Sequence, residues 1–146
     1  MPDEMFQVAG LIFTALTLGV MLFFSLVIAP LVFIKLPADA AGRFIRALFP
    51  WYYLVSGLLA TSAAMLFAFN SPVDAVLAAL VASAAFASRQ LLMPQINKWR
   101  DQMLAGAPTA DYKFNRGHQV SVLINAAQLI VLCILVWRVG LSPAIS

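Results

Sequence analysis

The feature of this sequence that most constrains its fold is the distribution of charge. Three stretches of more than twenty residues carry no charged side chain, and a fourth carries only Asp74 at its start and Arg89 near its end; they are Met5–Ile34, Ala47–Val73, Gly117–Trp137 and Val73–Met93. A helix rises about 1.5 Å per residue, so about 20 apolar residues cross the roughly 30 Å hydrocarbon core of a bilayer. The sequence therefore predicts a polytopic membrane protein with four transmembrane spans.

The composition favours helices over a β-barrel. Apolar residues make up 63% of the 146 and charged residues only 10%, whereas soluble domains carry about a quarter charged residues. Strands of a membrane barrel alternate in polarity, but these runs are continuously apolar, and a helix satisfies its own backbone hydrogen bonds in lipid. We expect one all-α integral membrane domain over residues 1–146, a four-transmembrane-helix bundle with spans at about 7–34, 48–69, 73–93 and 116–138.

Short amphipathic helices are expected on the cytoplasmic side, next to the spans. One is Ala40–Leu48, with Asp39 as a candidate cap, and another follows Pro94. Pro30 and Pro94 are expected to kink or end the first and third spans, because proline removes a backbone donor. Each of these prolines is followed by a basic segment and then by an even-numbered span. This order is compatible with a two-plus-two internal repeat but does not establish one.

The cationic residues predict how the chain is oriented. The first and third connections between spans hold seven of the nine Lys and Arg residues: Lys35, Arg43, Arg46, Lys98, Arg100, Lys113 and Arg116. Cytoplasmic loops of membrane proteins carry an excess of Lys and Arg. We therefore expect a multi-pass protein of the cytoplasmic (inner) membrane, with both termini on the non-cytoplasmic side. The partners expected are the lipid bilayer and, as further candidates, other membrane subunits or a homo-oligomer. The basic charge reports topology, so no nucleic-acid partner is expected.

One face of the last span holds candidates for a ligand-binding site. Polar or aromatic residues recur there at steps of three and four, within about 80° of arc; they are Phe114, His118, Ser121, Asn125 and Gln128. Polar side chains in lipid normally face other helices or a cavity. These side chains therefore either hydrogen-bond across the bundle or line a ligand or ion site, and the sequence leaves both interpretations open.

Three further candidates lie outside the last span. Arg89 is the one charge that lies away from the ends of the predicted spans, and it either extends to the cytoplasmic headgroups or faces an anionic ligand. Asn97 shares a face with Arg89, and Tyr52 belongs to an aromatic cluster at the start of the second span. Small and hydroxyl-bearing residues of the first two spans, among them Ser25 and Tyr53, are interpreted as packing surfaces.

The sequence offers little for catalysis or for a cofactor. A single histidine and a single cysteine do not make a familiar zinc site, and the one carboxylate within a predicted span, Asp74, lies at the very start of that span. No phosphate-binding loop or nucleophile elbow is present. We expect no catalytic residues, no metal and no cofactor, with haem held by His118 as the alternative. Cys133 is expected to be a small buried apolar residue.

Several short motifs, spread over most of the chain, resemble those of a known family. They are Ala29-Pro30 with Phe33, Leu36-Pro37, Gly42, Leu48-Phe49-Pro50-Trp51-Tyr52, Pro94 with Asn97, and Phe114 with His118, Ser121 and Asn125. The chain resembles the transmembrane protein 205-like family, known in bacteria as an integral-membrane domain of unknown function. The resemblance implies a four-helix membrane bundle without an established enzyme activity. Animal members are associated with platinum-drug resistance and vesicle traffic.

The chain departs from that family just before the proline of the third span. Members often have Asn-x-Arg-x3-Pro at this place, whereas this chain has Ser88-Arg89-Gln90, with the arginine shifted by one position. A family role for Arg89 therefore does not carry over. Three functional hypotheses follow: handling of a small molecule or ion at a polar site inside the bundle, an accessory subunit of a larger membrane complex, and a haem-bearing or other redox protein.

Overall fold

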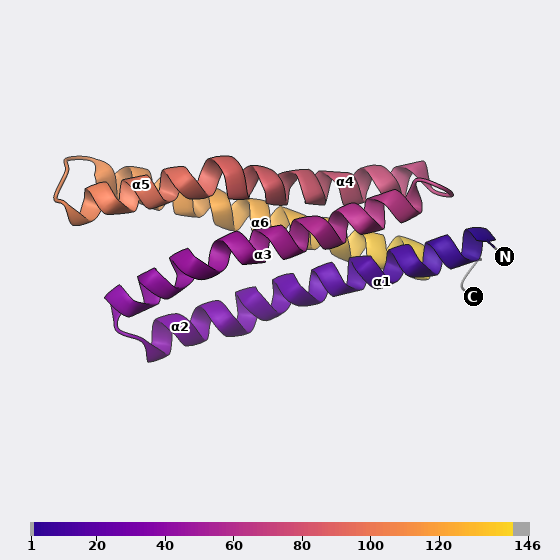
Figure 1. The fold of residues 1–146 in the computed structure, drawn as a ribbon, viewed down its shortest axis with the longest axis horizontal. Helices are drawn as coiled ribbons and strands as arrows, with labels where there is room; N and C mark the ends of the chain where they lie inside the picture. Colours follow the sequence, from indigo (N-terminus) through magenta and orange to yellow (C-terminus); the bar gives the residue numbers. More distant parts are fainter. Residues whose placement is uncertain (1, 142–146) are drawn as a thin grey trace.

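Four long helical rods, joined by short connections, make up the fold (Figure 1). The computed structural model describes residues 2–141, and all regular structure in that range is helical. The first rod consists of α1, a π-helical turn η1 and α2; α3 is the second rod; α4, the π-helical turn η2 and α5 form the third; and α6 is the fourth. In chain order the elements are α1 (Pro2–Phe23), η1 (Phe24–Ile28), α2 (Ala29–Lys35), α3 (Ala38–Phe67), α4 (Pro72–Ala87), η2 (Ser88–Leu92), α5 (Met93–Leu104) and α6 (Ala110–Gly140).

Each rod is long and apolar enough to cross a membrane. This confirms the predicted all-α bundle of four spans and indicates a multi-pass membrane protein. The surface fits that setting, because large apolar side chains such as Leu123, Ile130 and Trp137 are exposed along α6. Cys133 is also exposed, so the prediction that it is buried is wrong. The preceding residue, Leu132, is the one that is buried at this level of α6.

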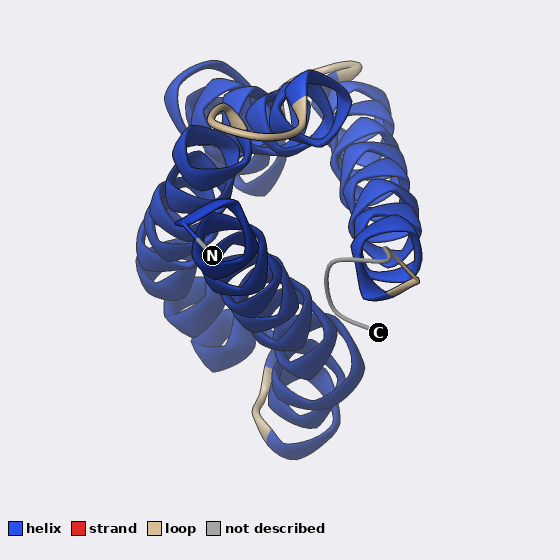
Figure 2. Ribbon diagram, turned by 90° about the vertical axis from the view of Figure 1, so that its right-hand side faces the viewer, coloured by secondary structure: helices blue, strands red, loops and turns tan. Residues whose placement is uncertain are grey.

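The two ends of the bundle differ in character. At one end, here called the termini end, the rings of Phe6 and Phe69 stack with centroids 4.6 Å apart and Arg138 pairs with Asp74. At the other end lie the α2–α3 and α5–α6 connections and the seven cations that flank them, and we call it the basic end. These two connections lie on opposite sides of the basic end in both views (Figures 1 and 2). The α2–α3 and α5–α6 hairpins therefore diverge toward it.

The first and third rods share an unusual backbone feature. In each, a five-residue π-helical turn begins six residues before a proline, at Phe24 before Pro30 and at Ser88 before Pro94. A proline cannot donate to the carbonyl four residues back, and the wider turn carries an N–H bond to a carbonyl five residues back instead. The prolines therefore do not end these rods. The matching position in both rods is compatible with the two-plus-two repeat.

The second rod is continuous where the sequence predicted a separate amphipathic helix. The segment 40–48 forms the first turns of α3, which runs through Pro50. Ala41 and Ile45 are buried in this segment, so neighbouring helices hold it in line with the rest of the rod. Asp39 does not cap the helix, because the N-cap residue is Pro37, and the Asp39 carboxylate pairs with Arg43 at 2.9 Å.

The contact between α5 and α6 depends on the absence of a side chain at Gly117. A Cβ at this position would lie 2.7 Å from the Trp99 ring and 3.0 Å from Ile96, whereas a Cβ at Gly19 would meet nothing within 4 Å. We expect Gly117→Ala to lower the free energy of unfolding by about 1–3 kcal/mol, because the Trp99 ring must shift. The matched control Gly19→Ala should raise it by about 0.5–1 kcal/mol. Denaturant unfolding in detergent measures both, and equal effects would contradict the close contact.

Candidate functional site

A cleft runs from the basic end into the bundle, between the α2–α3 and α5–α6 hairpins. Its outer part, the outer cleft, has a volume of about 330 Å³ and is lined by residues that include Gly42, Asn97 and Arg100. Its deeper part, the inner cleft, has a volume of about 370 Å³ and is lined by residues that include Ser25, Tyr52, Tyr53, Ser121 and Asn125. Phe33, Phe49 and His118 line both parts, so the two parts adjoin.

Hydrogen bonds between three rods form the deep end of the inner cleft. The Tyr52 hydroxyl donates to Asn125 Oδ1 at 2.5 Å, and Asn125 Nδ2 donates to Ser25 Oγ at 3.0 Å. Beside them, the hydroxyl groups of Tyr53 and Ser121 share a hydrogen bond of 3.2 Å. These contacts join η1, α3 and α6. They satisfy polar groups that would otherwise be costly inside an apolar bundle.

Stacked aromatic rings hold the two tyrosines in place. The Tyr52 ring stacks on Phe24 with centroids 4.2 Å apart, and the Tyr53 ring stacks on Phe49 at 5.5 Å. The two tyrosine rings themselves lie 5.1 Å apart. Such ring pairs contribute beyond the area that they bury. The inner cleft therefore combines an aromatic wall with a small number of fixed polar groups, the usual composition of a small-molecule site.

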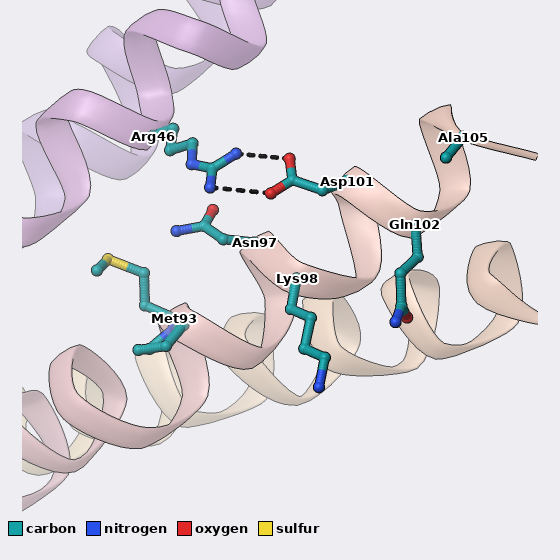
Figure 3. Close-up of a pocket in the computed structure, with 8 residues that line it drawn as sticks. Arg46, Met93, Asn97, Lys98, Asp101, Gln102 and Ala105 are labelled. Carbon is teal, nitrogen blue, oxygen red and sulfur yellow. Dashed lines mark hydrogen bonds and ion pairs between the residues drawn. The ribbon is translucent and has the colours of Figure 1, made fainter. Parts of the chain in front are cut away.

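An ion pair joins the two hairpins at the basic end. The Arg46 guanidinium of α3 donates to both carboxylate oxygens of Asp101 on α5, at 2.6 and 3.0 Å, and Asn97 lies beside them (Figure 3). Both charged groups lie beyond the apolar spans predicted from the sequence. The hydrogen bonds from Arg46 lower the pKa of the Asp101 carboxyl from its usual value. This is the pairing expected of a bidentate arginine and carboxylate.

Arg100 lies in the outer cleft without such a partner. Its guanidinium group rests on the backbone of α3 at Gly42, where an added Cβ would overlap it. Among the residues that the structure describes, Arg100 makes no hydrogen bond and no ion pair. The small residue at position 42 therefore gives the arginine room between the hairpins and leaves its donors available.

The structure brings together some of the residues that the sequence singled out. Tyr52, Ser121 and Asn125 meet in the inner cleft, and Asn97 lines the outer cleft. His118 lines both parts and is exposed, and its ring is stacked on Phe114 with centroids 6.4 Å apart. The polar stripe of the last span thus faces the cleft from Phe114 to Asn125.

Two predicted site residues lie elsewhere. Gln128 is buried, and its Nε2 donates to the Val81 carbonyl at 3.0 Å, which joins α6 to α4. Arg89 Nε donates to the Pro50 carbonyl at 3.2 Å, which joins η2 to α3. Neither side chain lines the cleft. One helix face therefore serves two neighbours, because α6 contacts different rods along its length.

Three residues of the cleft were not among the sequence candidates for a site. Ser25 and Tyr53 were interpreted as packing residues, and Arg100 was not singled out as a ligand-binding residue. Ser25 differs from Thr14 and Thr17 on the same rod, whose hydroxyls donate to carbonyls of their own helix at 2.8 and 2.7 Å. The signal that could have separated Ser25 is its place just before Pro30, where regular backbone bonding is interrupted.

Comparison with known proteins gives one match. A family model described as "Domain of unknown function (DUF4149)" matches residues 12–105. This range covers the first rod from residue 12 onward and all of the second and third rods, with the α2–α3 wall of the cleft and the α5 part of the other wall. The chain matches no curated protein and no solved structure.

Proposed function

The chain belongs to the DUF4149 family of domains of unknown function, and from that starting point we propose that it admits and binds a small molecule in the cleft. The observation that carries the proposal is the hydrogen-bonded group of Tyr52, Asn125 and Ser25 at the deep end of a lined hollow. Polar groups that serve packing alone can be enclosed between helices, as Gln128 is. This group instead borders open volume in an otherwise apolar bundle.

The orientation expected from the charges fits this proposal. With seven of the nine Lys and Arg residues at the basic end, that end faces the cytoplasm under the positive-inside rule. The mouth of the cleft then opens to the cytoplasmic face of the inner membrane, and both chain ends lie on the other face. A small molecule would enter from the cytoplasm or from the adjoining leaflet.

The finer kinship with the transmembrane protein 205-like family is part of the same proposal. Phe49 and Tyr52 belong to one of its motifs, Phe-Pro-x-Tyr, and line the inner cleft. His118, Ser121 and Asn125 belong to the other motif and line it from α6. Two motifs that lie far apart in the sequence therefore meet at one hollow, as expected if that hollow is what the family shares.

Cysteine labelling tests whether a small molecule reaches the inner cleft. In a Cys133→Ser background reconstituted in vesicles, the Ser121→Cys variant should react with sulfonatoethyl methanethiosulfonate about tenfold faster than a Leu123→Cys variant. Leu123 lies on the same helix but faces outward, with 69% of its surface exposed, where lipid keeps the thiol un-ionised and unreactive. The proposal is wrong if Ser121→Cys reacts no faster than Leu123→Cys.

A further inference from the structure

We propose that the occupant of the cleft is an anionic amphiphile, a single acyl chain with a phosphate or carboxylate head group. Its head group binds Arg100 at the basic end, and its chain lies along the aromatic wall of the cleft. This inference rests on the proposed function and names the class of molecule that the cleft takes.

The charge of the lining selects an anion. Arg46, Arg100 and His118 line the outer cleft, and within residues 2–141, which the structure describes, no Asp or Glu is found in the lining of either part. The guanidinium of Arg46 already donates two hydrogen bonds to the Asp101 carboxylate. Arg100 keeps its donors available, as described above. A guanidinium group presents a planar fork of N–H donors that matches a carboxylate or a phosphate.

The rest of the lining selects a molecule with an apolar part. Rings of Phe24, Phe33, Phe49 and Phe114 line the two parts of the cleft, of which the outer part holds Arg100 and the inner part holds Asn125. A free anion such as inorganic phosphate would leave this surface uncovered, whereas an acyl chain would bury it. The amphiphile is therefore favoured over a soluble anion.

The length of the cleft matches one leaflet. Phe114 in the outer cleft and Asn125 in the inner cleft are eleven residues apart on α6, a rise of about 16 Å at about 1.5 Å per residue. Half of the roughly 30 Å hydrocarbon core is about 15 Å. A chain that reaches from a head group at the basic end to Asn125 would therefore have the reach of a lipid chain in the adjoining leaflet.

The cleft also has a rim that an amphiphile could cross from the side. Pro30 and Phe33 of α2 and Val122 of α6 line the inner cleft and are exposed at the surface. The exposed fraction is 61% for Phe33 and 55% for Val122. An acyl chain could therefore enter the cleft from the leaflet, between α2 and α6. Its charged head group would stay at the basic end and would not have to pass through the apolar part of the membrane.

The test uses protection of the Ser121→Cys variant, in the Cys133→Ser background and in dodecyl maltoside, from the neutral reagent methyl methanethiosulfonate. Dodecyl phosphate should slow labelling about tenfold, whereas dodecyl trimethylammonium and inorganic phosphate should not. Adding Arg100→Gln should raise the dodecyl phosphate concentration for half protection about tenfold. Arg100→Lys, which keeps the charge but loses the fork, should give an intermediate value.

The matched control is Arg116→Gln. It removes the same charge from the same end of the bundle, but Arg116 is exposed and does not line the cleft, so half protection should not change. The proposal is overturned if the cationic amphiphile or inorganic phosphate protects equally well, or if Arg100→Gln and Arg116→Gln behave alike. Rapid labelling of Ser121→Cys without any of these differences would contradict the proposal of an anionic amphiphile and leave the proposed function standing. Absence of labelling would contradict both the amphiphile and the proposed function.

Discussion

Replacing Asn125 by leucine is expected to lower the free energy of unfolding by about 1–2 kcal/mol. Asn125 accepts from Tyr52 and donates to Ser25, and membrane side-chain hydrogen bonds contribute about 0.6 kcal/mol each on average. The variant also leaves the Tyr52 hydroxyl, in a buried residue, without its acceptor, which adds a desolvation cost. Unfolding by denaturant in detergent, followed by circular dichroism, measures the change.

A double-mutant cycle separates this hydrogen bond from simple loss of packing. Tyr52→Phe keeps the ring that stacks on Phe24 and removes only the hydroxyl group. The double variant Tyr52→Phe with Asn125→Leu should be more stable than the sum of the single effects implies, by about 1 kcal/mol, because residues in one network are coupled. Additive effects would show that the two side chains act independently, contrary to the geometry of the inner cleft.

The second large effect is expected at the termini end, where an ion pair joins α4 to α6. Asp74 is only 5% exposed, and its carboxylate accepts from Arg138 Nε at 2.8 Å and from the Ser71 hydroxyl at 2.6 Å. Arg138→Met should lower the free energy of unfolding by about 2–3 kcal/mol. Breaking a buried pair costs about 3–5 kcal/mol because one charge stays buried alone, and the loss is smaller here because 45% of the Arg138 side chain is exposed.

The basic end supplies a matched control for Arg138. Arg43 pairs with Asp39 at 2.9 Å, but both side chains are more than two-thirds exposed, and such surface pairs contribute about 0.2–1 kcal/mol. Arg43→Met should therefore have a small effect under the same conditions. Adding Asp74→Asn to Arg138→Met should recover part of the lost stability, since it removes the unpaired charge. If Arg138→Met costs no more than Arg43→Met, the Asp74 pair does not hold these helices together.

The fold followed from the sequence because lipid imposes a simple rule of length and polarity. The long apolar runs predicted the four rods, and Pro30 and Pro94 indicated where the odd rods depart from regular α-helical geometry. The π-helical geometry could not be predicted, since one proline is compatible with a kink, a helix end or a widened turn. The continuity of α3 through Pro50 was also missed, because burial of Ala41 and Ile45 by other rods is a tertiary effect.

The lining of the cleft was predicted in part, and the candidates that lie elsewhere have one cause in common. Helical spacing placed His118, Ser121, Asn125 and Gln128 on one face, but spacing alone does not say which neighbour each part of that face meets. Gln128 therefore meets α4, while Asn125 meets η1 and α3. The Arg100 guanidinium is available to a ligand because Asp101 pairs with Arg46 instead, a residue 55 positions away. It also needs the space that Gly42 leaves on another rod. No local pattern reports such distant arrangements.

The two π-helical turns make the walls of the cleft respond differently to the loss and to the gain of a residue. Each turn holds one residue more than an α-helical turn would, because its N–H bonds reach five residues back instead of four. Loss of one residue from η1 or η2 could therefore be absorbed by a return to α-helical bonding, and Pro30 and Phe33, or Asn97 and Arg100, would stay on the same helix face. Gain of one residue has no such outlet and would rotate these side chains by about 100° around the helix axis. The lining of the cleft should thus tolerate a deletion at these two places and be altered by an insertion.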